Sequence, residues 1–490
     1  MNSPNNFRFP AIVDEISNHL PEDIDLFLVG GAIRDHFLDR DSTDFDFTVS
    51  NGAIRFARKI ADVLHGDFFV LDEERDAARV LLPNKKIVLD FVGKKDGNIV
   101  SDLQGRDFTI NAMGVQLNAE RKFFDPCDGL PDLQKRSLRM CKPDAIANDP
   151  IRGLRAIRLA AQFGLSIQSD TSKEIRQASK HLFQSSNERI RDEFVRLLML
   201  PNPEGNLRTL DAVGLLDEII PEIKSLKDLE QSPPHVFTVW EHTLKSIGRA
   251  EKILGLLQRD YPTEGAQDLY GGMIVLSLGR FRDPITDLLG KQPTAGRSRW
   301  AQLLLALLLH DAGKGVTQQI AADRIRYPDH EEASAALASD WLERMKFSRT
   351  EIDSISKLIG AHKLVTKYSR QNTTLAPLSI YRYFREMGDL GIDLGLHSLA
   401  DLMGRWGVEL PEAVLSARLD VIRKLFEGYF EQFNEVIDPP TLLDGNAILA
   451  ETKHKTGPQI GIILELIREA QVEGKIQTHA EALALANAHI

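Results

Sequence analysis

The amino-acid sequence changes its hydrophobic periodicity once, near residue 149, and this change separates two kinds of predicted structure. Before it, residues 23–125 contain short runs rich in β-branched and aromatic residues, separated by turn residues, and helical patterns, notably around 52–64. The runs predicted as strands are 26–29, 46–49, 68–71, 78–82, 87–92 and 111–117. After it, apolar residues recur every three or four positions, which is typical of helices. The sequence therefore predicts an α+β N-terminal domain followed by an all-α remainder.

The length and composition predict a globular protein of several domains. A chain of 490 residues exceeds the size of one hydrophobic core, and 43% hydrophobic with 27% charged residues is ordinary for globular proteins. The N-terminus lacks the pattern of a signal peptide, and the longest apolar stretch, 303–309, is too short for a membrane span and predicts a buried helix. Two cysteines cannot build a disulfide framework. We expect a cytoplasmic protein with no membrane partner, and the oligomeric state stays open.

Proline clusters and a change of charge suggest the domain boundaries. The net charge of −11 excludes a uniformly basic surface, yet residues 152–196 hold nine Lys or Arg against five Asp or Glu. Such a local surplus suits RNA contacts, although a solvated helix face would have the same composition. Breaks at SPPH and DPPTLLDG interrupt the helical patterns. The predicted domains are 1–147, 148–231, 232–437 and 438–490.

A glycine turn follows the first predicted strand. The strand ends at Gly30-Gly31, and a helical stretch containing Arg34 comes next. Such a turn brings backbone N–H groups and the positive end of a helix towards a phosphate, and Arg34 adds a charged fork. A simple tight turn would use the same glycines, so the acids that follow are the more informative feature.

Three acids in two predicted strands suit a metal site. Asp44 and Asp46 lie two positions apart, so their carboxylates share one face of the strand while Phe45 and Phe47 face the core. Adjacent carboxylates repel unless a cation separates them, and Mg²⁺ is the natural cation beside nucleotide phosphates. Asp90 stands among apolar residues and needs a partner or a metal if it is buried; a partly exposed edge position is the alternative. The three together suit two-metal phosphoryl transfer.

These motifs resemble those of a known family. They look like the signatures of polymerase-β-like nucleotidyltransferases, specifically the class II (bacterial-type) tRNA nucleotidyltransferases and poly(A) polymerases with a C-terminal HD domain. The matching segments, all between residues 30 and 198, are GGAIRD, DFDFT, DLQGRDFTINAMG, NDPIRGLRAIRLAAQFG and NERIRDEFVRLL. The resemblance implies a nucleotidyltransferase head with a mixed sheet, followed by an all-α neck, body, HD domain and tail.

The resemblance also assigns residues in the head and neck. It implies that Asp44 and Asp46 bind Mg²⁺, and we expect Asp90 to orient or activate the attacking hydroxyl. The residues expected to contact CTP or ATP are Gly30, Gly31, Arg34, Arg106, Asp107, Asn111, Asp149, Arg152, Arg155 and Arg158. The last three arginines are spaced to form one stripe along a helix. An Asp acceptor beside an Arg donor can imitate a Watson–Crick edge shared by C and A; a salt-bridge ladder is the alternative.

Two positions depart from the family pattern. Gly105 stands where the family usually has the first Arg of its RRD motif, and Asn148 replaces the Glu of its EDxxR motif. The expected activity is addition of CCA to tRNA, or to another RNA 3′ end, from CTP and ATP with release of pyrophosphate. The alternatives are a poly(A) polymerase, an enzyme that adds only A or only CC, and an HD phosphohydrolase or RNA-binding module with an inactive head.

A second set of candidate ligands lies in the helical part. His242, the pair His310-Asp311, and Asp401 follow the H…HD…D order of the HD phosphohydrolase superfamily. Imidazoles and carboxylates suit a divalent cation such as Mg²⁺, Mn²⁺, Ni²⁺ or Co²⁺. We expect a metal-dependent phosphoesterase site, with His330 and His362 assisting at a second metal or a phosphate; a structural domain is the alternative.

The C-terminal segment resembles the helical tail of enzymes that carry an HD domain. Gly457-Pro458 begins a predicted helix, and its apolar positions Ile460, Ile463, Leu464 and Ile467 fall on one face. This stripe predicts a module that packs on the helical body.

Overall fold

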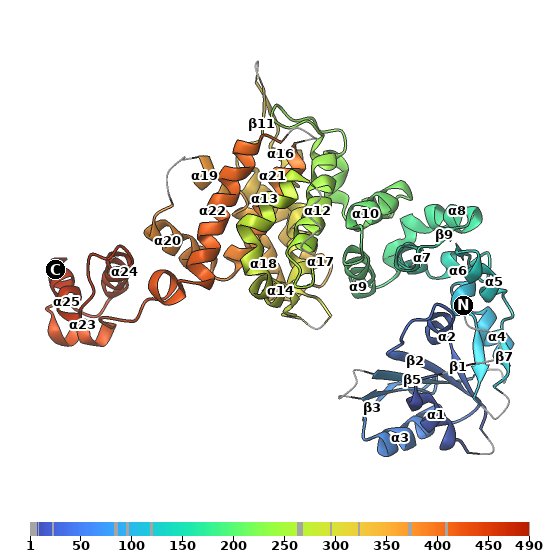
Figure 1. The fold of residues 1–490 in the computed structure, drawn as a ribbon. Helices are drawn as coiled ribbons and strands as arrows, with labels where there is room; N and C mark the ends of the chain where they lie inside the picture. The colour runs from blue at the N-terminus through green and yellow to red at the C-terminus, as the bar shows by residue number, and fades with distance from the viewer. Residues whose placement is uncertain are drawn as a thin grey trace. The chain divides into compact units, whose positions relative to one another are not determined.

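The structure is a computed structural model, and its fold falls into two compact units (Figure 1). The first comprises residues 1–200 and 208–219, and the second comprises residues 201–207 and 220–490. The described residues are 7, 9–21, 24–82, 87–94, 98–117, 121–261, 268–294, 296–321, 324–370, 375–406 and 410–489. This division does not test the boundaries of the four predicted domains, which remain predictions.

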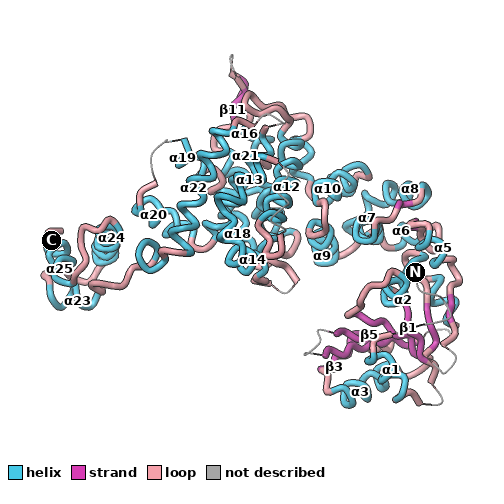
Figure 2. The backbone as a smooth tube through the Cα atoms, viewed as in Figure 1, coloured by secondary structure: helices cyan, strands magenta, loops and turns pink. Residues whose placement is uncertain are grey.

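The first unit contains a seven-stranded mixed sheet in the order β3-β4-β5-β2-β1-β6-β7. Its strands, magenta in Figure 2, are β1 (Leu26–Val29), β2 (Asp44–Val49), β3 (Asp67–Asp72), β4 (Ala77–Leu82), β5 (Ile87–Gly93), β6 (Gly114–Gln116) and β7 (Phe123–Phe124). Only β2 and β5 pair in parallel, and the other neighbours are antiparallel. Parallel neighbours need a crossover, and the chain between β2 and β5 supplies it with α3 (Ala53–Leu64) and the β3–β4 hairpin.

Alternating residues of the central strands form the core of this unit. Phe47 of β2 stacks on Phe91 of β5 with ring centroids 4.8 Å apart, and Phe56 of α3 meets Phe91 edge-on at 5.6 Å. All three rings are buried. Burial of aromatic surface on one face of the sheet stabilises the unit and leaves the other face of β2 and β5 for polar side chains.

Five of the six predicted strands are confirmed within two residues at each end, as is the predicted helix at 52–64. The expectation for 111–117 was wrong over its first half. There the chain forms a 3-10 turn, η2 (Thr109–Asn111), and the strand β6 begins only at Gly114. The turn directs the side chain of Asn111 inward, where it hydrogen-bonds to Asp107 and Arg34.

Helices complete the first unit. They are α1 (Ala11–Asn18), α2 (Gly31–Phe37), α4 (Ile99–Gln104), α5 (Gly129–Gln134), α6 (Ala145–Asn148), α7 (Ile151–Phe163), α8 (Ser169–Ala178), α9 (Asn187–Leu198) and α11 (Leu215–Ile219). The short strands β8 (Ser137–Leu138) and β9 (Ser166–Ile167) pair in parallel. Gly164, with φ +62°, ends α7 in the left-handed conformation that glycine adopts without strain.

The second unit is helical and follows the predicted periodicity. Its main helices are α12 (Val239–Leu256), α13 (Leu269–Leu278), α14 (Arg282–Gly290), α15 (Arg299–Leu309), α16 (Lys314–Thr317), α17 (His330–Arg344), α18 (Arg349–Gly360), α19 (Leu364–Arg370), α20 (Pro377–Met387), α21 (Leu390–Arg405) and α22 (Glu412–Phe430). The chain between 299 and 309 is the predicted buried helix. A short hairpin of β10 (Gln319–Ile320) and β11 (Ile325–Arg326) is the described exception to its helical character.

The C-terminal tail forms its own small core rather than packing its apolar stripe on the helical body. Helices α23 (Gly445–Glu451), α24 (Pro458–Val472) and α25 (His479–Asn487) surround Ile463 and Ile467, with Ile460 and Leu464 packed against them. The tail meets α20 through polar pairs such as Arg382 with Glu469. The predicted apolar face is therefore correct, but its partner is the tail itself.

Among the described residues, no helix has both the length and the apolar character needed to cross a membrane.

Candidate functional site

The acids of β2 and β5 share one face of the sheet in the first unit. Asp44 and Asp46 are exposed, whereas Phe45 and Phe47, at the alternate positions, are buried. The parallel pairing of β2 with β5 places Asp90 directly opposite Asp46. The predicted alternation is therefore observed, and the three carboxylates come from adjacent strands.

Asp90 has a protein partner that the sequence did not reveal. Arg79 of β4 is its neighbour across the antiparallel ladder and donates two hydrogen bonds, from Nε to Oδ1 at 2.7 Å and from Nη2 to Oδ2 at 2.8 Å. This pair explains how an acid is tolerated in an apolar strand. It depends on the register between β4 and β5, which cannot be read from either strand alone.

Asp46 lies in a crowded electrostatic environment. Desolvation by the surrounding protein raises its pKa, the carboxylates of Asp90 and Asp44 raise it further, and Arg106 opposes them. Gly30, with φ +80°, provides the space for two of these groups: a Cβ there would lie 2.8 Å from Arg106 Nη1 and 3.1 Å from Asp46 Oδ2. The turn before α2 therefore borders the acid cluster, as its sequence suggested.

A buried polar network connects the turn, η2 and α7. Arg34 Nη1 donates to Asn111 Oδ1 at 2.6 Å, Asn111 Nδ2 donates to Asp107 Oδ1 at 3.2 Å, and Arg155 Nε lies 2.9 Å from Asp107 Oδ2. Arg34 also stacks over the ring of Phe163 at 4.1 Å, and burial lowers its pKa. Four of the predicted nucleotide-contacting residues thus hold one another in place.

A cavity of about 770 Å³ opens between α4, α7 and α9. Its lining includes Asp102, Gly105, Arg106, Asp107, Asp149, Arg152, Arg155 and Arg189. The structure therefore gathers residues 106, 107, 149, 152 and 155 around one space, within the size range of ligand pockets. Its walls carry five arginines and five acids among the described residues, so donors and acceptors both line the space.

Arg158 belongs to a different environment. It follows Arg155 at helical spacing, but its Nε pairs with Glu193 of α9 at 2.5 Å and its Nη1 contacts Gln162 at 2.8 Å. Arg158 is absent from the described lining of the cavity, whereas Glu193 is part of it. Along α7, therefore, Arg152 and Arg155 face the cavity, while Arg158 joins α7 to α9.

The nearest ion-pair partner of Asp149 is Arg189, which was not among the predicted site residues. Arg189 Nη2 of α9 lies 2.9 Å from Asp149 Oδ2, while Arg152 Nε is 3.9 Å from the same atom. Arg189 belongs to the ERI segment, so its motif marked the helix but not this contact. Asn148 donates to Asp144 at 2.9 Å and contributes nothing to the described cavity lining. Arg152 is left with one hydrogen bond of 3.3 Å to the carbonyl of Ala145.

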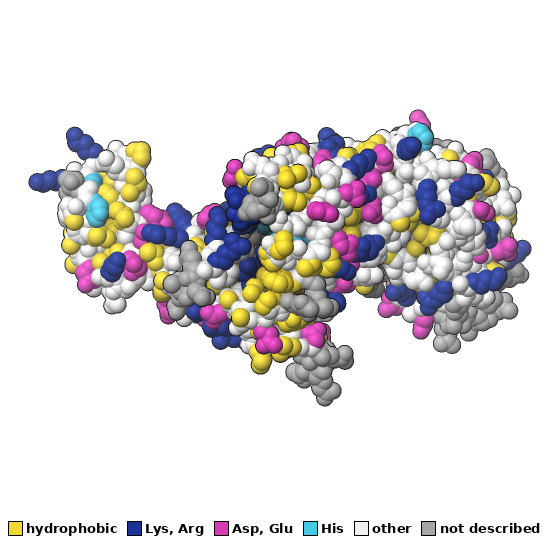
Figure 3. Space-filling model, turned by 90° about the horizontal axis from the view of Figure 1, so that it is seen from above, with side chains coloured by type: hydrophobic (Ala, Val, Ile, Leu, Met, Phe, Trp, Pro, Cys, Tyr) yellow, Lys and Arg dark blue, Asp and Glu magenta, His cyan; other side chains and the backbone are white. Residues whose placement is uncertain are grey.

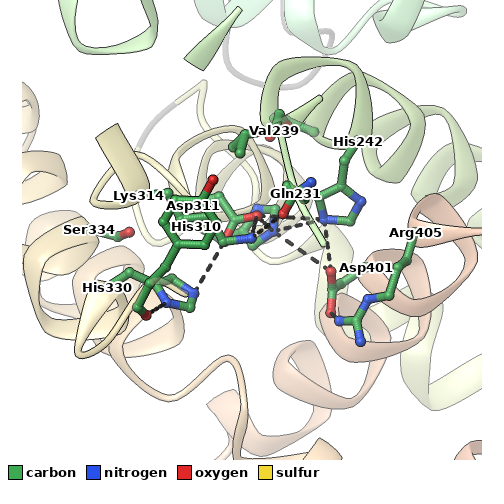
Figure 4. A network of polar contacts seen from close by, with 12 residues as sticks. Gln231, Val239, His242, His310, Asp311, Lys314, His330, Ser334, Asp401 and Arg405 are labelled. Carbon is green, nitrogen blue, oxygen red and sulfur yellow. Dashed lines mark hydrogen bonds and ion pairs between the residues drawn. The ribbon is translucent and has the colours of Figure 1, made fainter. Parts of the chain in front are cut away.

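The second unit brings all six predicted HD-type residues together. His242 comes from α12, His310 and Asp311 follow α15, His330 begins α17, His362 follows α18 and Asp401 lies on α21. His242 Nε2 lies 3.0 Å from Asp401 Oδ1 and 3.3 Å from His310 Nε2. Figure 4 shows the side chains of His242, His310, Asp311, His330 and Asp401 lying close together.

The six residues form two adjacent groups of ligand atoms. One contains His242, His310 and Asp401, and the other contains Asp311, His330 and His362; all are buried, and the ligand atoms of each group lie within 4.8 Å of one another. Mixed imidazole and carboxylate donors fit a divalent cation. The two groups can therefore hold metal ions, and their proximity suits a pair of metals.

The pKa shifts in this metal-free cluster favour the metal-binding form of most ligands but not of His310, whose pKa Asp311 raises against the effect of burial. Although burial opposes it, His310 and Lys314 hold the pKa of Asp311 well below its ordinary value. Burial lowers the pKa of His242 and of His362. A deprotonated carboxylate and neutral imidazoles are the states that coordinate metals.

Cations and a histidine outside the predicted set surround the cluster. Lys314 Nζ lies 2.7 Å from Asp311, and Arg405 Nη2 lies 3.0 Å from Asp401 (Figure 4). His235, in the SPPH break, meets His242 edge-on with ring centroids 5.4 Å apart, and burial lowers the pKa of His235 to about 2. These residues line a cavity of about 510 Å³, and Figure 3 shows Lys and Arg side chains around a hollow in this unit. The HDAGK sequence could have pointed to Lys314, whereas no sequence pattern marked Arg405.

The fold and the two sites define a nucleotidyltransferase head joined to helical and HD-type domains. The chain matches the family models "Poly A polymerase head domain" at residues 26–139, "Probable RNA and SrmB- binding site of polymerase A" at 164–227 and "HD domain" at 288–381. It is 30% identical to the A-adding tRNA nucleotidyltransferase of Deinococcus radiodurans over 464 residues, covering 93% of this chain and 94% of the relative. The chain therefore belongs to the bacterial-type tRNA nucleotidyltransferase family and is a nucleotidyltransferase.

Other relatives carry related names. The chain is 27% identical to the CC-adding tRNA nucleotidyltransferase of Thermus thermophilus, over 94% of this chain and 92% of the relative. It is 30% identical to the multifunctional CCA protein of Pseudomonas aeruginosa, over 78% and 86%. In fold it is similar to a CCA-adding enzyme solved with CTP, with a TM-score of 0.63, 16% identity, and coverage of 98% of this chain and 96% of that one.

Proposed function

We propose that the first unit completes the CCA end of tRNA from CTP and ATP, releasing pyrophosphate, in the cytoplasm. The observation that carries this proposal is the placement of Asp44, Asp46 and Asp90 on one sheet face, with Arg106 linking that face to a cavity lined by arginines and acids. The 3′ hydroxyl of the RNA attacks the α-phosphate of the nucleotide. The bond between the α- and β-phosphates breaks, and pyrophosphate leaves.

The chain's own residues have distinct parts in this reaction. Asp44 and Asp46 would hold the catalytic Mg²⁺, which would activate the hydroxyl and neutralise charge on the triphosphate. Asp90 orients the attacking hydroxyl, and Arg106 and the α2 turn contact the phosphates. Asp149 and Arg152, which line the cavity, present an acceptor and a donor to the base. The network through Asn111 keeps Asp107 and Arg34 in position.

Three purified tRNAs ending before CCA, after C and after CC test the proposal. Each is incubated with Mg²⁺ and with labelled CTP, ATP or both, and the products are sized at single-nucleotide resolution. Full CCA addition to the shortest tRNA supports the proposal. Addition of A only to the tRNA ending in CC, or of CC alone, assigns the chain to the partial activity named for its relatives. Long runs of A on unrelated RNA would contradict tRNA specificity.

A second activity is supported by the two ligand groups of the HD-type cluster. We propose a metal-dependent phosphoesterase in the second unit, with His242, His310, Asp311 and Asp401 as principal ligands and His330 and His362 completing the second group. His310→Ala with Asp311→Ala should abolish hydrolysis of a phosphomonoester while CCA addition continues. Absence of hydrolysis by the unaltered protein with Mg²⁺, Mn²⁺, Co²⁺ and Ni²⁺ would make this domain structural.

A further inference from the structure

The cavity of the HD-type cluster carries far more positive charge than one phosphate needs. Seven Lys or Arg line it, namely Lys314, Arg324, Arg326, Lys363, Lys367, Arg370 and Arg405, against two acids, Asp311 and Asp401. Both acids belong to the metal-ligand groups. The surplus is local, because the whole chain has a net charge of −11.

Ion pairs join three of these cations to nearby acids. Lys314 pairs with Asp311, Arg405 with Asp401, and Lys363 with Glu331 at 2.8 Å. Lys367 and Arg370 are exposed, and neither has an ion pair with any residue that the structure describes. Exposed cations that line the same cavity repel one another, so a polyanionic ligand would stabilise Lys367 and Arg370.

Lys367 and Arg370 lie on α19, the helix that begins two residues after His362 of the HD-type cluster. Lys363 directly follows His362, and positions 363, 367 and 370 are spaced four and three residues apart, so they share one face along α19. Seven residues of helix extend about 10 Å from the cluster. Residues 354–385 contain six Lys or Arg and no Asp or Glu, so this stretch offers no internal partner for these cations.

The same cavity offers little to a nucleobase. Tyr327 is the one aromatic phenyl-type ring among the described lining residues, and its hydroxyl already donates to the carbonyl of Glu230. Sites for single-stranded RNA usually stack bases on aromatic side chains. The cavity therefore favours a chain of phosphates over an RNA end.

We propose that Lys367 and Arg370 form a second anion subsite, which selects ligands with two or more linked phosphates for hydrolysis at the HD-type cluster. This inference rests on the phosphoesterase proposed above. Water, with divalent cations bound at the cluster, supplies the nucleophile. Its oxygen forms a bond to the terminal phosphorus, and the bond from that phosphorus to the bridging oxygen breaks. The bridging oxygen stays with the remaining phosphate chain, and the water proton passes to the products and solvent.

Binding and turnover of inorganic tripolyphosphate test the subsite in the full-length protein. Calorimetry without metal compares tripolyphosphate with orthophosphate for the unaltered protein, for Lys367→Ala with Arg370→Ala, and for Lys291→Ala with Arg349→Ala. The last variant removes the same two charge types from exposed positions outside the cavity. We expect at least tenfold weaker tripolyphosphate binding in the subsite variant only. The ratio of kcat/KM for tripolyphosphate to that for para-nitrophenyl phosphate should fall by a similar factor.

The outcomes separate the two proposals. Equal effects of the subsite and control variants, or equal affinity of the unaltered protein for both anions, would overturn the subsite. So would hydrolysis confined to RNA ends or monoesters, although the phosphoesterase itself would then stand. If the unaltered protein hydrolysed no substrate, the phosphoesterase proposal would be rejected. The metal-free comparison of tripolyphosphate and orthophosphate binding would still test the anion subsite.

Discussion

At the scale of single residues, the head depends on charges that the fold holds close together. Asp46 faces Asp90 across the parallel ladder and Asp44 along its own strand, and its pKa is raised by desolvation and by these carboxylates. A carboxyl with a raised folded-state pKa destabilises the folded protein once the pH exceeds its unfolded value. The proposed metal site is therefore assembled at some expense of stability.

Asp46→Asn tests this conflict between function and stability. Nucleotide addition should be abolished, because one metal-holding carboxylate is lost. The melting temperature at pH 7 should stay the same or rise, because the repulsion is relieved. Primer-extension gels and calorimetry measure the two effects. Residual addition near the unaltered rate, or a clear fall in melting temperature, would contradict the role given to Asp46.

Asn111 provides a second residue-scale prediction. Asn111→Ala leaves the buried Arg34 and Asp107 each without one hydrogen-bond partner, which typically costs about 1–3 kcal/mol. We expect a loss of this size in the free energy of unfolding by urea, together with a raised KM for nucleotides. Asn148→Ala, which removes an exposed hydrogen bond to Asp144, is the matched control and should change stability by less than about 0.5 kcal/mol.

Motifs and periodicity predicted the candidate residues themselves but not their partners in the folded protein. Spacing alone placed Asp44 and Asp46 on one face, and the motifs marked Asp107 and Arg155. The partners Arg79 and Arg189 were not predicted, because each contact depends on register or helix packing across long sequence separations. Local patterns thus located the chemistry but not the residues that fix it in place.

At the scale of elements, α7 performs two tasks with consecutive turns. Arg152 and Arg155 lie at the cavity, whereas Arg158 pairs with Glu193 and connects α7 to α9. Periodicity predicted the helix and one cationic stripe, but it could not show that Arg158 pairs with Glu193 of α9. The error at 111–117 has a similar origin, since tertiary hydrogen bonds of Asn111 favour a turn over a strand.

This division of α7 predicts two different kinds of defect. Arg152→Ala should raise the KM for CTP and ATP with little change in melting temperature. Arg158→Ala should cost about 1–3 kcal/mol of stability, because Glu193 keeps only the more distant Arg196 at 3.7 Å. Steady-state kinetics and urea unfolding distinguish the cases. Equal nucleotide defects in both variants would show that the three arginines act as one stripe.

At the scale of the whole molecule, the buried histidines link stability to pH. His397, a buried residue of α21, lies beside His310 and His362, with ring centroids 5.4 Å and 6.1 Å away. Burial lowers the pKa of His397 to about 3 and also lowers the pKa values of His242 and His362, whereas Asp311 raises that of His310. A histidine with a depressed folded-state pKa is protonated first in the unfolded chain. Its contribution to stability is present above about pH 6.5 and is lost as the pH falls towards the folded value.

The metal-free protein should therefore lose stability on acidification from pH 7 to 5. His397 alone contributes on the order of 2 kcal/mol of this loss. The reason is that pH 5 lies about 1.5 units below the unfolded pKa of a histidine, near 6.5, and each unit corresponds to about 1.4 kcal/mol. His397→Leu should flatten the dependence of unfolding free energy on pH, measured in urea with EDTA. His479→Ala, at an exposed histidine with a raised pKa, should not flatten it. An unchanged slope in His397→Leu would refute the assignment.

The pairing of β2 with β5 has a consequence for how the head tolerates insertions and deletions. Adding or removing one residue inside either strand would turn its carboxylate towards the phenylalanine core and bring an apolar side chain to the reaction face. Such a change would inactivate the enzyme while every catalytic side chain remained encoded. Length variation in this head should consequently be confined to the connections between strands, and the spacing of its acids is as strictly required as their identity.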